Sequence, residues 1–171
     1  KAAAPFLPAS SVNVSTLDGR TTEIPASALE GLKARLKGPP VFPGDAGYEE
    51  ARTVWNAMID RRPACVVRCL GTADVIAGVQ FAREHRLLLC IKSGGHNIAG
   101  LATADGALML DLSLMRGVWV DAKKKVAHAQ GGCRIGDRPI DYHLEVLRQF
   151  GAVVEKQPHG IALTAPQRLR G

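Results

Sequence analysis

The stretch CVVRCLGTADVIAGVQFAREHRLLLCIKSGGHNIAG, residues 65–100, decides the fold. It opens with CVVRCL, 65–70, a β-branched apolar run that predicts a strand. After a glycine, Thr72 can cap a helix that continues to about His85, because apolar residues recur on one face. The fully apolar LLLCI, 87–91, predicts a strand buried on both sides. This order indicates the βαβ start of a mixed α+β domain.

The residues that follow this stretch predict three more strands. ALMLDL, 107–112, is an apolar run of strand length. GVWVD and KVAHAQ, 117–121 and 125–130, alternate around a turn that is rich in lysine. This pattern predicts a β-hairpin with a solvated tip.

The residues before it predict two helices. Residues 1–23 are rich in Pro, Ser and Thr, so we expect a mobile lead-in. Ser27 and Glu30 form a capping box that predicts a short helix ending at Gly38. From 47 to 59 the spacing of apolar residues predicts an amphipathic helix.

We expect three segments in the chain: a lead-in with one short helix over 1–46, a lobe over 47–133, and a tail over 134–171. In the tail, Pro139 suits the first turn of a helix and Gly151 its end, and a strand, a turn and a second strand follow. The predicted fold class is α+β, with a mixed sheet, a βαβ start and flanking helices, followed by a helix-strand-strand tail.

Composition narrows the classes of function. The chain has 171 residues and a formal net charge of +6, but its basic residues are scattered, which argues against a nucleic-acid partner. No apolar run approaches the roughly 20 residues of a membrane span, so no membrane partner is expected. The 4 cysteines form no CxxC pair. The first ten residues lack the apolar h-region of a signal peptide, so we expect no secretion signal. We therefore expect reduced thiols, a cytoplasmic protein and no metal site.

KSGGHNIAG, 92–100, is the loop that carries candidate chemistry. Its glycine pair lets the backbone turn sharply after a strand, and consecutive amides in such a turn can bind an anion such as a pyrophosphate. The pattern is not GxGxxG and does not open a helix, which excludes a Rossmann site. Two interpretations stay open: an ordinary glycine turn with a surface histidine, or a ligand site, which includes a small non-catalytic anion-binding α+β module.

The segment Arg61–Cys133 resembles the front half of the flavin domain of FAD-linked oxidases of the berberine-bridge-enzyme-like group. The resemblance rests on Lys92-Ser93-Gly94-Gly95-His96 after a strand, and on Asp111-Leu112-Ser113 with Met115 downstream. It implies FAD as the cofactor, a small-molecule substrate, and hydride transfer to the flavin with oxygen as the acceptor.

The resemblance also implies roles for single residues. His96 would bond the methyl carbon at position 8 of the isoalloxazine, and Cys133, in a Gly-Gly-Cys step, would bond carbon 6. An imidazole substituent withdraws electrons from the ring, so this bond should raise the reduction potential. The implied cofactor-binding residues are Lys92, Ser93, Gly94, Gly95, His96, Asn97, Gly100 and Cys133.

The tail gives a second resemblance, because residues 131–171 are similar to a segment of UDP-N-acetylglucosamine enolpyruvyl transferase. The similarity rests on the Gly-Gly-Cys step and on Arg138-Pro139, Asp141 and His143. It implies Cys133 as a catalytic thiol, with Arg138 and Asp141 as substrate-binding residues. Neither family's remaining domains are in this sequence, so we expect that further domains or a partner chain complete the site.

Overall fold

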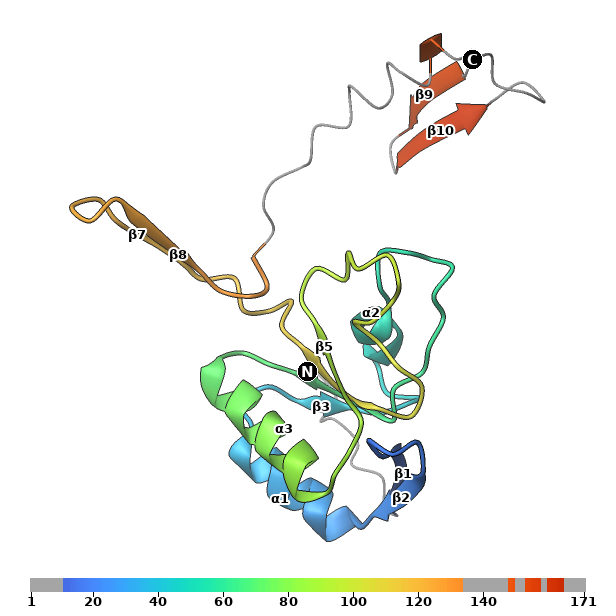
Figure 1. Ribbon diagram of the computed structural model, residues 1–171, viewed down its shortest axis with the longest axis vertical. Coiled ribbons are helices and arrows are strands. Elements are labelled where there is room, and N and C mark those ends of the chain that lie inside the picture. Colours follow the sequence, from blue (N-terminus) through green and yellow to red (C-terminus); the bar gives the residue numbers. More distant parts are fainter. Residues whose placement is uncertain (1–10, 134–147, 150–152, 158–159, 165–171) are drawn as a thin grey trace. The chain divides into compact units, whose positions relative to one another are not determined.

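The computed structural model describes residues 11–133, 148–149, 153–157 and 160–164 (Figure 1). The chain forms two compact units, Lys1–Arg134 and Ile135–Gly171.

The first unit is built on a four-stranded mixed sheet in the order β3-β4-β6-β5. Strands β4 (Cys65–Arg68), β6 (Leu108–Asp111) and β5 (Leu89–Lys92) are parallel, and β3 (Pro40–Val41) pairs with β4 in the antiparallel sense. The chain therefore places β6 between the two strands of its βαβ unit. The predicted mixed sheet with a βαβ start is confirmed.

Helices cover both faces of this sheet. The helices α1 (Ala26–Arg35) and α3 (Thr72–Glu84) lie side by side on one face (Figure 1). The short helix α2 (Tyr48–Arg52) packs on the other. Along β4 the side chains alternate between the two cores, because successive residues of a strand point to opposite faces. Cys65 and Val67 join the core under α1 and α3, whereas Val66 joins the core under α2.

Both predicted side-chain caps are wrong. Helix α1 is preceded by Pro25, with no side-chain cap, and Ser27 lies inside its first turn. Helix α3 covers the predicted range, but Gly71 precedes it and Thr72 is already helical. The amphipathic helix expected over 47–59 is also wrong, because α2 ends at Arg52.

The sequence also missed contacts outside the central elements. Residues 11–23 are not a simple lead-in, because β1 (Val12–Ser15) and β2 (Thr21–Ile24) form an antiparallel hairpin. Val14 and Ile24 fix it to the core, since each is only 2% exposed. Strand β5 is not buried on both sides, because it is the edge strand and Ile91 is 48% exposed.

The remaining strands form two separate hairpins. Strands β7 (Val118–Asp121) and β8 (Val126–Ala129) pair as predicted, in the first unit. In the second unit β9 (Val153–Gln157) and β10 (Gly160–Thr164) form the expected strand pair. The helix predicted before them lies largely outside the described residues. Within the described ranges, no helix has both the length and the apolar character that a membrane span requires.

Candidate functional site

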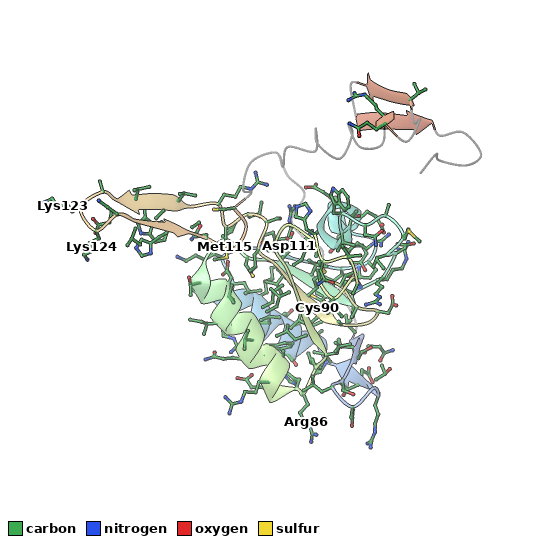
Figure 2. All side chains as sticks on the ribbon, turned by 45° about the horizontal axis from the view of Figure 1, so that its top comes forward. Arg86, Cys90, Asp111, Met115, Lys123 and Lys124 are labelled. Carbon is green, nitrogen blue, oxygen red and sulfur yellow. The ribbon has the colours of Figure 1, made fainter. Side chains whose placement is uncertain are left out.

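Three charged residues meet at the carboxyl edge of the parallel strands. Arg68, Lys92 and Asp111 are the last residues of β4, β5 and β6, and the strand register puts them in one row. Asp111, labelled in Figure 2, is fully buried. One of its carboxylate oxygens lies 3.5 Å from Lys92 Nζ and the other 3.7 Å from Arg68 Nε. This row forms the base from which the loops at that edge leave the sheet.

Burial and the Asp111 carboxylate act on the Lys92 ammonium in opposite directions. Burial lowers the pKa of its ammonium, and the neighbouring Asp111 carboxylate acts in the opposite direction. Asp111 also accepts hydrogen bonds from the Ser113 amide and hydroxyl, at 3.1 and 3.0 Å. The described hydrogen bonds and ion pairs of this carboxylate thus go to Ser113, Arg68 and Lys92.

The Gly-Gly-His turn begins directly after Lys92. Gly95 has φ +71°, and a Cβ there would lie 3.3 Å from the Val54 Cα, so backbone strain and space both favour glycine. Its carbonyl accepts the Trp55 N–H at 3.1 Å. The turn is therefore held against the segment that follows α2.

His96 projects from this turn as an exposed side chain. Its ring centroid lies 6.0 Å from that of Trp55, which is 74% exposed. A Cβ on Gly94 would come within 2.6 Å of the imidazole, so the missing side chain is what lets His96 fold back over the turn. An exposed imidazole above a turn without side-chain bulk fits close approach by a large ligand such as FAD.

The rest of the loop is closed by polar contacts. The Asn97 side-chain oxygen accepts the Leu101 N–H at 3.1 Å, and Asn56 donates to the Ile98 carbonyl at 3.2 Å. Arg61 donates to the Gly100 carbonyl at 3.3 Å. The hydrogen bonds of Asn97 and Gly100 thus stabilise the conformation of the loop in this structure.

The structure brings the two glycine pairs together. The Ser93 hydroxyl donates to the Gly131 carbonyl, which joins the Gly-Gly-His turn to the Gly-Gly-Cys turn. Gly132 is required there, because a Cβ would lie 1.9 Å from the Leu112 carbonyl oxygen. Cys133 is half-buried, with its thiol 3.4 Å from the Gly117 carbonyl.

The other three cysteines differ from Cys133 in being fully buried. Burial raises the pKa of Cys65 and Cys69 to about 12 and that of Cys90 to about 11, which makes them poor nucleophiles. No group of three or more metal-ligating side chains occurs among the described residues.

Sequence reasoning missed Trp55 and the row of charges beneath the turn. Only its contact with His96, 41 positions further along the chain, reveals that Trp55 belongs to the site. Arg68 and Asp111 lie inside predicted strands and Lys92 directly follows one, but the predicted strand ends did not line the three residues up. The predicted substrate residues Arg138 and Asp141 lie outside the described residues.

Part of the first unit is similar to a known family of domains. Residues 63–138 match the FAD binding domain family. The match covers the βαβ unit and both glycine pairs, so the FAD cofactor expected from the sequence is supported.

Individual oxidases are also similar to this chain. (R)-6-Hydroxynicotine oxidase of Paenarthrobacter nicotinovorans is 35% identical over 102 residues, which are 60% of this chain and 22% of the relative. The structure of 6-hydroxy-D-nicotine oxidase from Arthrobacter nicotinovorans aligns with 31% identity and a TM-score of 0.56, over 69% of this chain and 25% of that one. Carbohydrate oxidase from Microdochium nivale aligns with 27% identity and a TM-score of 0.57, over 76% and 27%.

The chain therefore spans about a quarter of the length of the proteins it matches. The fold of the first unit is that of the first lobe of a flavin-oxidase FAD domain. These relatives lend no support to the resemblance between residues 131–171 and enolpyruvyl transferase, and that interpretation is withdrawn.

Proposed function

We propose that the loop 92–100 and the turn 131–133 form part of the FAD site of an FAD-dependent oxidoreductase. The observation that carries the proposal is the exposed Gly-Gly-His turn at the carboxyl edge of the parallel strands, within the segment 63–138. When bound, FAD supplies the hydride acceptor for oxidation of a small-molecule substrate, with oxygen as the final acceptor and a cytoplasmic setting.

In this proposal the chain binds and orients the cofactor. The backbone of Ser93, Gly94 and Gly95 faces the pyrophosphate, since consecutive amides in such a turn can form a concave site for an anion. Asn97 and Gly100 set the far side of the loop through the hydrogen bonds described above. Lys92 supports the loop from inside the protein and does not face the cofactor, because its buried ammonium donates to the Ala51 carbonyl.

His96 and Cys133 are the proposed attachment residues for the flavin ring. His96 would bond through a ring nitrogen, and Cys133 through its sulfur. Each bond would replace an N–H or S–H bond of the side chain and a C–H bond of the flavin, and the proton and the hydride equivalent that are lost would pass to oxygen as the two-electron oxidant. The contact between Ser93 and Gly131 supports this arrangement, since it joins the two turns that carry these residues.

A visible absorption spectrum of the purified protein, with and without added FAD, tests the proposal. We expect flavin bands that stay with the protein after acid precipitation. His96→Ala should leave flavin retained through sulfur, and only the double variant with Cys133→Ala should release it. A colourless protein that cannot be loaded with FAD would contradict the proposal, and binding of inorganic pyrophosphate by that colourless protein would support the non-catalytic anion-binding module.

The substrate-binding residues are proposed to come from further domains or a partner chain. Catalysis requires reacting atoms within about 3–3.5 Å of each other and controlled access of water, and half a site provides neither. The 171-residue chain alone should therefore release no peroxide from alcohol or sugar substrates. Sustained peroxide release that His96→Ala abolishes would show that the site is complete without other domains.

A further inference from the structure

Helix α2 ends in an unusual exchange of hydrogen-bond partners. In a continued helix the Trp55 N–H would bond the Ala51 carbonyl, four residues earlier. Instead the Trp55 N–H donates to the Gly95 carbonyl at 3.1 Å, and the Lys92 ammonium donates to the Ala51 carbonyl. The same ammonium lies 3.4 Å from the carbonyl of Thr53.

We propose that Lys92 is a positioning residue for the Gly-Gly-His turn. Its ammonium takes the place of the Trp55 N–H at the end of α2, and this leaves the Trp55 N–H to hold the Gly95 carbonyl. The identity of the ligand rests on the proposed function, but the positioning of the turn does not.

Lysine has the properties that this position requires. An ammonium carries three N–H donors and can serve both carbonyls and the Asp111 carboxylate at once. The carboxylate compensates its charge in a place where the side chain is only 8% exposed. An apolar side chain of the same length would fill the space and leave the two carbonyls without this donor.

A chain of contacts links Lys92 in the sheet to His96 on the turn. Lys92 fixes the end of α2, Trp55 follows three residues after Arg52, and its backbone and ring both contact the turn. The centroid distance of 6.0 Å between Trp55 and His96 means that a displaced Trp55 removes a neighbour of the imidazole. Lys92 therefore acts on the exposed histidine through Trp55.

Amide hydrogen exchange measured by NMR on the full chain tests the inference. In Lys92→Met the Trp55 amide should exchange about tenfold faster, because its partner on the turn is no longer held in place. The Cys69 amide, which bonds the Asp111 carbonyl at 2.9 Å, is the reference in the sheet and should not change.

Arg68→Met is the matched control. It also removes one positive charge beside Asp111, but Arg68 pairs with Glu50 and Asp111 and makes no described contact with the carbonyls of Ala51 or Thr53. The Trp55 amide should stay within about twofold of the unmodified chain. Equal acceleration in both variants, or none in Lys92→Met, would overturn the inference.

The conservative variant and the cofactor add independent readouts. Lys92→Arg keeps a charged donor and should restore most of the Trp55 protection, and FAD affinity should fall about tenfold in Lys92→Met only. If the Trp55 amide responds as expected but neither the unmodified chain nor any variant binds FAD, the proposed function is wrong and the positioning role of Lys92 stands.

A folding control covers loss of structure. Should Lys92→Met lose its cooperative thermal transition, the double variant with Asp111→Asn, which also removes the unbalanced carboxylate, takes its place in the exchange measurement. If the double variant is also unfolded, Lys92 supports the whole domain rather than the turn, and the inference is overturned.

Discussion

Strands β6 and β7 have nearly the same kind of sequence and opposite environments. LMLD and VWVD each have four residues, three of them apolar and the last an aspartate. All four residues of β6 are buried, whereas the three apolar residues of β7 are exposed. Strand β6 has a neighbour on each side, and among the strands that the structure describes β7 pairs only with β8. Sheet context, more than the composition of the strand, therefore decides burial here.

The two aspartates show the same contrast in their partners. Asp111 lies between Arg68 and Lys92 inside the protein. Asp121 accepts the backbone N–H groups of Lys123 and Lys124 at an exposed turn. One carboxylate compensates buried charge, and the other shapes a turn in contact with water.

The largest expected effect comes from removing these carboxylates one at a time. Asp111→Ala should lower the free energy of unfolding by about 4 kcal/mol, because two largely buried cations lose their counter-charge. Asp121→Ala should cost less than about 1 kcal/mol, because water replaces the lost acceptor. Urea denaturation of both variants measures the difference. Similar losses would mean that β7 is covered in solution.

Valine truncation compares the apolar side chains of the same regions. Val67 of β4, which pairs with Leu110 of β6, is 0% exposed, and Val120 of β7 is 68% exposed. Val67→Ala should lower the melting temperature clearly, at a cost of about 2 kcal/mol, while Val120→Ala should stay within about 0.5 kcal/mol. A cost at Val120 comparable with that at Val67 would show that the hairpin is packed against another surface.

A smaller effect should appear in alkali, and Cys65 of β4 contributes to it. The pKa of Cys65 rises from 9.0 to about 12 through burial, so above pH 9 the unfolded state loses a proton that the folded state keeps. Stability should therefore fall as pH rises from 9, by up to about 1.4 kcal/mol per pH unit for this thiol. Burial raises the pKa of Cys69 and Cys90 in the same sense, whereas the lowered pKa of Lys92 acts in the opposite sense.

Urea midpoints at pH 8, 9 and 10 for the unmodified chain and Cys65→Ala measure this contribution. The decline with pH should be less steep in the variant, because one titrating thiol is missing from its unfolded state. Equal declines would mean that Cys65 ionises in the folded protein and is not shielded as described.

The sequence predicted which segments form strands better than it predicted which strands pair with each other. The apolar run containing Leu108 and Leu110 predicted β6, and the alternation around Asp121 predicted the β7–β8 hairpin, because both signals are local. The position of β6 between β4 and β5 depends on residues far apart in the sequence, so local patterns do not predict it. This position buries Asp111 on the central strand and leaves Ile91 exposed on an edge strand.

In the candidate site, too, the local features were predicted and the contacts between distant residues were not. The glycine pair and His96 were predicted from the loop itself, and the left-handed φ of Gly95 accords with that reasoning. The early end of α2 could not be predicted, because the donor that ends it is Lys92, 41 residues from Ala51 along the chain. The contact that Trp55 makes with the turn depends on that end and was missed with it.

The position of β6 also has a consequence for the order of folding. Strands β4 and β5 are consecutive in the chain but share no hydrogen bond, since each pairs with β6. The segment up to Lys92 can form α3, but among the described strands β4 then pairs only with the two-residue strand β3, and β5 has no strand partner until residues 108–111 are available. A chain emerging from the ribosome would thus carry incompletely paired apolar strands for some time, an interval in which chaperone binding or aggregation competes with folding. The transition state should involve β6, and truncations that stop before Leu108 should not fold.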